Sequence, residues 1–203
     1  MPEPVLSEIR LAADPAAWAA AGFDVDEPVG GVGLSFVAGE GGIVDLALTE
    51  VRAAGIDGLA TRVGPVPADT SAVHPNGVSG IDHVVVLTPQ LGRTTQALEG
   101  EGIRLRRNRE GETGGGGVRK QAFFRLGRPI LEVVEAHELN SEEAARFWGI
   151  TFVTEDLDAA AELLGDRLGG VKDAVQPGRR IATVRREAGL GLPVALISPH
   201  GGD

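Results

Sequence analysis

The chain has 203 residues, with 42% hydrophobic and 24% charged side chains, which suits one compact domain or two small ones that share a core. It contains no cysteine, so disulfides, thiol nucleophiles and iron–sulfur clusters are excluded, and any metal must be held by His, Asp or Glu. The formal net charge of −10 and the absence of tyrosine disfavour general nucleic-acid binding, because an acidic surface repels phosphate and offers few stacking platforms.

The chain also lacks the sequence signals of a membrane or exported protein. No apolar run approaches the roughly 20 residues that a membrane span needs. Residues 1–10 contain no basic region followed by an apolar stretch, so a signal peptide is not indicated. We therefore expect a cytoplasmic protein without a membrane partner.

The N-terminal part, residues 1–52, carries a weak succession of expected elements. Three stretches have the composition of strands, namely residues 6–12, 32–37 and 43–48. Residues 15–21 predict a short Ala-rich helix, with Asp14 as its cap and Pro15 in its first turn. Residues 24–29 would supply one more strand. Order and spacing alone thus indicate a degenerate module of one strand, one helix and three strands.

Residues 53–79 predict a linker. They hold Pro65, Pro67 and Pro75 together with many small residues, and such composition favours a chain with little regular structure. A long irregular stretch is unusual inside a compact protein, so we expect it to run over the surface between modules.

Residues 80–139 predict a clearer module. Residues 81–88 are a β-branched run typical of a strand, and residues 93–98 read as a helix that ends at Gly100 or Gly102. Three further strands are expected at residues 103–107, 121–126 and 129–135. The four glycines at 114–117 predict a loop between strands, and no Gly-Lys-Ser/Thr follows that would make a phosphate loop.

The same order recurs in residues 140–203. A strand over residues 148–154 precedes a helix over 156–168, which has an apolar stripe at Leu157, Ala160, Leu163, Leu164 and Leu168. Strands are then expected at residues 171–175, 181–186 and 193–198. The two modules align on Thr88 and Thr154, each of which ends a first strand. The predicted fold class is α+β, with tandem βαβββ modules.

A tandem βαβββ module that opens with Ile81-Asp82-His83-Val84-Val85-Val86 resembles the vicinal-oxygen-chelate superfamily, which contains glyoxalases, extradiol dioxygenases and bleomycin-resistance proteins. The resemblance is clearest over residues 80–199. It implies that two modules pair, that their mixed sheets curl into a cup, and that the helices lie outside. It also implies that a divalent metal often sits in the cup, on a first-strand residue, commonly His, and a last-strand residue, commonly Glu.

The resemblance assigns ligand positions unevenly among the modules. In residues 80–139 the two positions are His83 and Glu132, and both match the pattern. In residues 140–203 they fall on Gly149 and Ala195, neither of which can bind a metal. In residues 1–52 they fall on Glu8 and Asp45, which are able to do so. If the middle and C-terminal modules form the cup, half the metal site is missing.

If instead the N-terminal and middle modules pair, four ligands meet: Glu8, Asp45, His83 and Glu132. One imidazole and three carboxylates suit Mn²⁺, Fe²⁺, Mg²⁺ or Zn²⁺. No organic cofactor is indicated. Against these assignments stand the structural interpretations, in which His83 is a hydrogen-bonded core residue and Glu132 faces solvent.

The ligand-contacting residues are predicted from strand alternation. Gln121, Phe123 and Arg125 share one face of a strand, and we expect that face to line the cup, although Ala122, Phe124 and Leu126 are the alternative. Two clusters of arginines stand out in an acidic chain: Arg104, Arg106, Arg107 and Arg109, and Arg179, Arg180, Arg185 and Arg186. Either could attract an anionic ligand, with Arg180 as the candidate near the turn at residues 176–179, or could be a solvated strand face.

Two classes of function follow. In the first, a metal-dependent lyase, isomerase or oxygenase, the cation polarises two neighbouring oxygens of the substrate and Glu132 moves a proton. In the second, the cup sequesters a small molecule without chemistry. The intact pair in the middle module favours the first class, and the blank positions in the C-terminal module favour the second. A small-molecule ligand is the expected partner, with a homodimer as a further option.

Overall fold

The computed structural model describes residues 3–52, 54–67, 72–112 and 118–200, which form two mixed β-sheets with few helices. The larger sheet has eight strands, in the order β11 (Lys172–Asp173), β12 (Arg180–Thr183), β13 (Val194–Ile197), β10 (Arg146–Thr154), β6 (Val78–Thr88), β9 (Ile130–Glu135), β8 (Val118–Arg125) and β7 (Leu105–Glu112). The first strands of the middle and C-terminal modules, β6 and β10, pair antiparallel at its centre. The expected α+β class with paired βαβββ modules is therefore confirmed.

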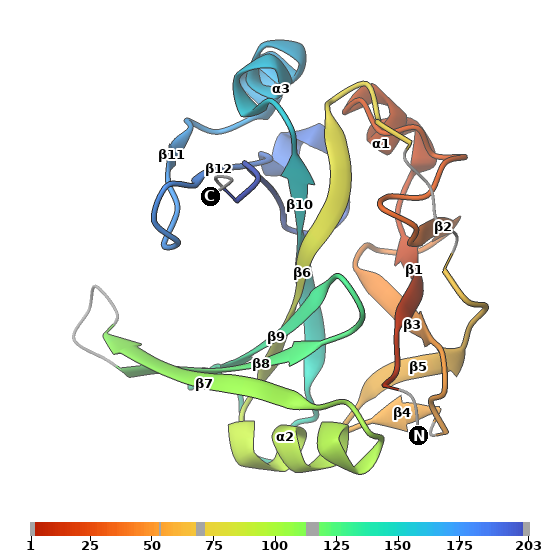
Figure 1. Cartoon of the computed structure of the whole chain (residues 1–203), viewed down its shortest axis with the longest axis vertical. Coiled ribbons are helices and arrows are strands. Elements are labelled where there is room, and N and C mark those ends of the chain that lie inside the picture. The colour runs from red at the N-terminus through yellow and green to blue at the C-terminus, as the bar shows by residue number, and fades with distance from the viewer. Residues whose placement is uncertain (1–2, 53, 68–71, 113–117, 201–203) are drawn as a thin grey trace.

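The eight-stranded sheet is strongly curved (Figure 1). Its two ends, β7–β8 and β11–β12, stand out on the same side of the central strands, so the sheet has a concave and a convex face. In each module the first strand runs parallel to the last, β6 with β9 and β10 with β13. The two modules thus repeat one topology on either side of the β6–β10 seam.

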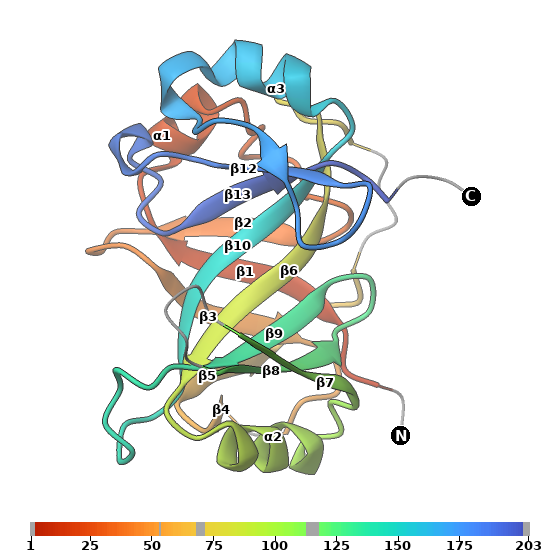
Figure 2. The same ribbon diagram turned by 90° about the vertical axis from the view of Figure 1, so that its left-hand side faces the viewer.

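The helices of these modules lie outside the curve, as expected (Figures 1 and 2). Helix α2 (Leu91–Gly100) lies under β7–β9, and α3 (Leu157–Leu164) lies above β11–β13 and is followed by the 3₁₀ turn η1 (Gly165–Arg167). Asp156 caps α3 by accepting hydrogen bonds from the backbone of Asp158 and Ala159. Leu163, which the apolar stripe predicts to be buried, is 46% exposed instead. Among the described helices, none has the length and apolar character to cross a membrane.

The N-terminal region forms a separate five-stranded sheet. Its strands are β1 (Leu6–Ala12), β2 (Gly33–Val37), β3 (Ile43–Leu48), β4 (Gly55–Ile56) and β5 (Leu59–Val63), in the order β2-β1-β3-β5-β4, and α1 (Pro15–Ala20) connects β1 to β2. Here the first strand is parallel to the second and antiparallel to the third, unlike in the other two modules.

Two expectations for this region differ from the structure. Residues 24–29 are all described and form turns with one bridge, Val29 to Val32, instead of a strand. The presumed linker is partly regular, because β4 and β5 pair with each other and β5 extends the sheet beside β3. The many prolines and small residues of this segment favour irregular structure, so the sequence pattern does not predict its short β-hairpin. Residues 68–71 lie outside the described part of the chain.

The five-stranded sheet covers the convex face of the larger one (Figure 1). Between them Trp18 is fully buried against Phe23, Phe36 and Phe152, with ring centroids 4.9 to 5.9 Å apart, and its indole Nε1 donates to the carbonyl of Leu190 at 3.1 Å. These contacts join α1, β2, β10 and the C-terminal module in one core. The concave face is left free by this packing.

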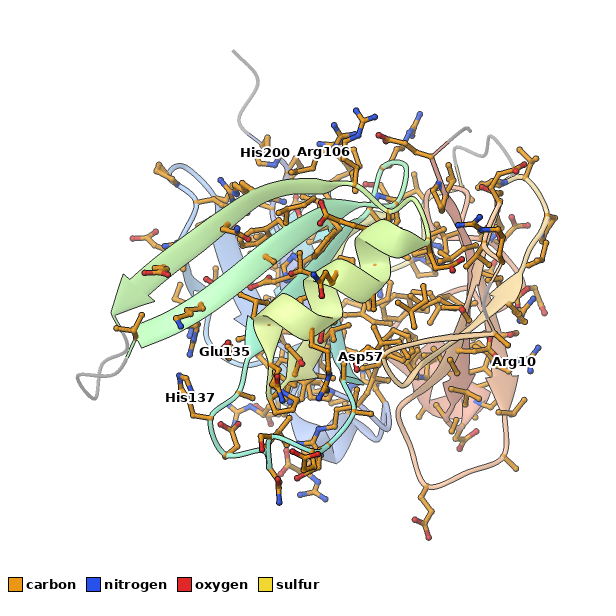
Figure 3. The ribbon with its side chains drawn as sticks, turned by 90° about the horizontal axis from the view of Figure 1, so that it is seen from below. Arg10, Asp57, Arg106, Glu135, His137 and His200 are labelled. Carbon is orange, nitrogen blue, oxygen red and sulfur yellow. The ribbon has the colours of Figure 1, made fainter. Side chains whose placement is uncertain are left out.

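A polar contact fixes the other end of the small sheet to the middle module. Asp57, in the β4–β5 turn with φ of +50°, accepts hydrogen bonds from Arg93 Nε at 2.8 Å and Thr94 Oγ1 at 2.5 Å, both on α2 (Figure 3). Thr94 in turn contacts Thr88 at the end of β6, at 2.7 Å between hydroxyl oxygens. The strand end at Thr88 is therefore held by the N-terminal sheet.

The chain's only two tryptophans allow a matched test of this core. Trp18→Ala should lower the free energy of unfolding by about 3–5 kcal/mol, because it leaves a large cavity and an unpaired Leu190 carbonyl. Trp148→Ala should change it little, since Trp148 is 49% exposed. Denaturant unfolding followed by circular dichroism measures both, and equal losses would contradict the packing described.

Candidate functional site

A β-bulge in β6 sets the position of the candidate site. Ile81 pairs with Phe152 and His83 with Thr151, so Asp82 is an extra residue in β6. Ile81 and Val84 are both buried in the core on the convex side, although they are three residues apart. The bulge therefore places Asp82 and His83 together on the concave face.

A chain of polar contacts runs through these two residues. Asp82 Oδ2 lies 2.7 Å from Nδ1 of His83, and His83 Nε2 lies 3.4 Å from Oε2 of Glu132 on β9. The amide Nε2 of Gln121 on β8 donates to the other carboxylate oxygen of Glu132. Behind Asp82, Arg179 Nη1 lies 2.7 Å from Oδ1. Because Asp82 holds Nδ1, the imidazole ring presents Nε2 to Glu132 and the cup.

The ion pair behind His83 is almost entirely buried. The side chain of Arg179 is 1% exposed and also donates to the Ser198 carbonyl at 2.7 Å and to Gln176 Oε1 at 2.5 Å. Burial alone would raise the pKa of Asp82, but hydrogen bonds from His83 and Arg179 and their charges outweigh it and hold the pKa below its ordinary value. Asp82 is therefore a carboxylate at neutral pH.

The polar pair lies in a hollow of about 650 Å³ on the concave face. Apolar side chains from both modules form part of its wall: Val85, Leu87, Val134, Trp148, Ile150, Pro193 and Val194. Charged and polar side chains also line it: Arg119, Glu135, His137, Glu138, Lys172 and Thr183. Gln121 and Thr151 add polar atoms beside His83 and Glu132. The hollow is therefore a cup with apolar patches, a polar centre at His83 and Glu132, and further charged residues in its lining.

The C-terminal module offers no ligand at the positions matching His83 and Glu132. Gly149 lies opposite Val85, and a Cβ added there would stand 2.6 Å from the carbonyl oxygen of Pro193. Such an approach is too close for any side chain, so backbone packing requires glycine here. Ala195 lines the cup wall without a donor atom.

The structure does not bring Glu8 and Asp45 to His83 and Glu132. Glu8 binds Arg62 at 2.6 Å and also accepts from Ser35 at 2.5 Å, and Asp45 binds Arg62 at 2.9 Å and Arg10 at 3.2 Å, all within the five-stranded sheet. Figure 3 shows Arg10 on the opposite side of the molecule from Glu135 and His137, which line the rim of the cup. The four-ligand arrangement considered from the sequence is therefore not formed.

The physical reason is that arginine meets the need of these two carboxylates for a positive charge. Burial would raise the pKa of Glu8, but the hydrogen bonds from Ser35 and Arg62, with the charges of Arg62 and Arg10, lower it. The carboxylates are thus balanced without a metal. The sequence pattern does not reveal Arg62 as their partner, because this residue lies in the segment that reads as a linker.

Strand β8 has the expected orientation. Ala122 and Phe124 are fully buried on the side of α2, so Gln121, Phe123 and Arg125 are on the concave face. Gln121 contacts Glu132, and Phe123 lies beneath the guanidinium of Arg107, 4.6 Å from its ring centroid. Arg125 is exposed at the end of the strand.

Arg180 points away from the cup. It forms a two-pronged pair with Asp158 on α3, at 2.9 and 2.8 Å. Its neighbour Arg179 reaches the site instead. Strand alternation in β12 indicates this orientation of Arg180. Arg180 lies on the same face of the strand as buried Ala182, whereas Ile181 and Thr183 lie on the face that lines the cup. The sequence does not identify Asp82 as a residue of the site, because a β-bulge is not evident from one sequence.

The donor set does not fit a complete metal centre. Among the described residues, no three His, Asp or Glu side chains are grouped as ligands. His83 and Glu132 form the pair at the centre of the cup, while Glu135, His137 and Glu138 line its wall apart from them. Catalytic zinc sites use three protein ligands. Both donors also have protein partners, Asp82 for the imidazole and Gln121 for the carboxylate.

The pKa of Asp82 gives a testable pH dependence. A carboxyl whose pKa is lowered by folding stabilises the protein above its ordinary pKa, which is 3.8 for Asp, and loses this contribution as the pH falls through the folded value. Asp82→Asn should therefore lower the free energy of unfolding by about 1–3 kcal/mol at neutral pH. The difference from wild type should shrink below pH of about 4. Thermal unfolding at pH 7 and pH 3 measures it, and a constant difference would contradict the assignment.

Comparisons with known proteins give structural likeness only. No protein-family model and no curated protein matches the chain. Solved structures that align with it include methylmalonyl-CoA epimerase from Mycobacterium tuberculosis, at 17% identity and a TM-score of 0.49 over 62% of this chain and 91% of that one.

Two further structures align over a similar share. A Streptomyces coelicolor methylmalonyl-CoA epimerase variant in complex with 2-nitronate-propionyl-CoA has 17% identity and a TM-score of 0.48, over 62% of this chain and 98% of that one. A hypothetical protein from Bacillus halodurans has 12% identity and a TM-score of 0.47, over 61% and 96%. The sequence resemblance implies that two βαβββ modules pair and that their sheets curl into a cup, and the structure has two such modules in one curved sheet, paired through their first strands. In fold, the chain resembles the vicinal-oxygen-chelate superfamily.

Proposed function

We propose that the chain binds a small organic molecule in the cup, with its apolar body against the walls and a polar group at His83 and Glu132. The observation that carries this proposal is the His83–Glu132 pair at the centre of a hollow of about 650 Å³ whose wall is apolar in part. Small-molecule sites typically measure ~300–1,000 Å³ and combine apolar walls with a few placed polar groups.

The buried pair behind His83 supports binding at a preorganised polar centre. Asp82 fixes the ring, and Arg179 fixes Asp82 from within the protein, so His83 loses little freedom when a ligand arrives. Glu132 is held by Gln121 in the same way. A ligand hydroxyl or amide can bridge Nε2 and the carboxylate across their gap of 3.4 Å.

A second candidate is proton transfer by Glu132, in isomerase or lyase chemistry. The carboxylate–imidazole contact favours it, because a carboxylate beside a positioned imidazole is a common acid–base pair. The metal that the resemblance implies is not needed for this chemistry, and the two-donor set argues for binding without one. Sequestration of a ligand without turnover uses the same cup.

Binding can be followed through a single tryptophan. The chain has no tyrosine, Trp18 is buried in the core, and Trp148 lines the cup. In a Trp18→Phe variant, the neutral apolar probe N-phenyl-1-naphthylamine should quench Trp148 and saturate at one probe per chain. Ala195→Phe, which fills the cup wall, should weaken binding at least about tenfold, or 1.4 kcal/mol.

The matched control is Val63→Phe, because Val63 is 70% exposed on β5, away from the cup. It should leave probe binding unchanged. Unaltered binding in Ala195→Phe would place the probe elsewhere and contradict the proposed cup.

Metal binding and proton transfer are separated by two measurements. Titration of untagged protein with Mn²⁺ and Zn²⁺ should give no tight stoichiometric site, and a tight site that His83→Ala abolishes would contradict the metal-free proposal. For a ligand found by screening, Glu132→Gln should retain binding. If Glu132 transfers protons, the variant should lose about 100-fold or more in the rate of deuterium exchange from solvent into the ligand.

A further inference from the structure

The β7–β8 hairpin carries a row of arginines on the concave face of the sheet. Cross-strand pairs share a face, and the register pairs Arg107 with Phe123, Arg109 with Gln121, and Gly111 with Arg119. Gln121 and Arg119 line the cup. Arg107, Arg109, Arg119 and Arg125 therefore all stand on the cup side of the hairpin, which we call the arginine lip.

The arginines of the lip form no ion pair with a described carboxylate, although Glu132, Glu135 and Glu138 line the same cup. Arg104 and Arg106, from the same sequence cluster, pair with Glu3 at 3.2 and 2.9 Å, and Lys120 pairs with Glu135 at 3.6 Å. Among the described side chains, no carboxylate forms an ion pair with any arginine of the lip, and Arg107 rests on the Phe123 ring. The cluster thus divides into a paired outer set and an unpaired set that faces the cup.

The arginines of this row are exposed, so solvent screens their mutual repulsion and leaves it weak. Arg109 and Arg119 occupy diagonal positions on adjacent strands, where side chains lie roughly 7–8 Å apart at Cα and like charges repel. The rest of the chain is acidic, with a net charge of −10, so acids for pairing are abundant elsewhere. A bound anion would remove the repulsion, because arginine binds phosphate and carboxylate with paired hydrogen bonds.

The lip also lies at a defined distance from the polar centre. Glu132, Gln121 and Arg109 belong to the consecutive strands β9, β8 and β7. Neighbouring strands are ~4.8 Å apart, and Arg109 pairs with Gln121 whereas Glu132 pairs with Phe123, so the two residues are also offset by two positions along the strands. Arg109 therefore stands about 12 Å from the backbone of Glu132. A ligand that reaches both needs a polar group and an anionic group separated by a body of about that length.

We infer that the molecule bound in the cup is an amphiphilic organic anion, whose phosphate, carboxylate or sulfonate group is held by Arg109 and Arg119 at the arginine lip. This inference rests on the proposed binding function and adds the chemical class of the ligand. It explains why a strongly acidic chain keeps an unpaired cationic row at the edge of its cup.

Two dyes test the inference in the Trp18→Phe background. 8-Anilino-1-naphthalenesulfonate carries an anion on the body of N-phenyl-1-naphthylamine, so the pair differs by one charged group. The double variant Arg109→Gln/Arg119→Gln should bind the sulfonate about tenfold or more weakly, because it removes the charge-assisted hydrogen bonds to the anion, while binding of the neutral dye stays unchanged.

The matched control is Arg104→Gln/Arg106→Gln, which removes the same charge from the same segment but outside the cup. It should change sulfonate binding by less than about twofold, a shift within the range expected for exposed charges. Equal losses of sulfonate affinity in both double variants would mean that net charge alone causes the effect. No loss of affinity in Arg109→Gln/Arg119→Gln would mean that these two arginines do not bind the anion. Either result overturns the inference.

The two dyes also distinguish a failure of the ligand class from a failure of the cup. If neither dye quenches Trp148, the cup itself is wrong and the proposed function fails first. If the neutral dye binds but the sulfonate gains nothing from Arg109 and Arg119, only the ligand class is wrong. Random duplex DNA that displaces the sulfonate at physiological salt, with a steep salt dependence, would make the lip a polyanion surface and also overturn the inference.

Discussion

The bulge at Asp82 and His83 is the constraint on which the site depends. A regular β6 would alternate strictly, and His83 would share the core face of Ile81 on the convex side. The extra residue shifts the alternation, so that the strand keeps its buried residues on both sides of the bulge while two polar side chains reach the cup. Arg179 stabilises this irregular segment, because it pairs with Asp82 where the ladder is interrupted.

The N-terminal sheet supports this arrangement from behind. It buries the convex face of β6 and β10, so the curved sheet has two different environments: a dry core on one side and a half-open cup on the other. The carboxylates of Glu8 and Asp45 in this sheet form ion pairs with Arg62 of the same sheet. The region is therefore a structural backing for the cup and does not supply half of a metal site.

The sequence predicted elements better than their assembly. The register of Thr88 and Thr154 placed β6, α2, β10 and α3, because period-2 and period-3.6 patterns are local properties of a chain. The pair His83–Glu132 followed from the same alignment. Local sequence patterns do not indicate which two modules pair, and the structure answers this through the pairing of β6 with β10.

The misplaced residues Arg180, Glu8 and Asp45 share one cause. A charged side chain is directed by the partner that it finds across the fold, and these partners lie 17 to 54 residues away in the sequence. Strand alternation alone puts Arg180 on the face of buried Ala182, and it puts Gln121 and Phe123 on the concave face of β8, so alternation carried more information about side-chain direction than charge did.

The missing ligand positions of the C-terminal module have a packing origin that bears on function. Gly149 is required by the close approach of Pro193, and this approach belongs to the pairing of β10 with β13 that closes the cup. A histidine at position 149 would displace the strand that forms the opposite wall. The absence of a ligand at this position therefore follows from the packing of the sheet and could not be reversed by one substitution. With one imidazole and one carboxylate at its centre and an unpaired cationic lip at its edge, the cup is better suited to recognising a ligand by charge and shape than by a chelated cation.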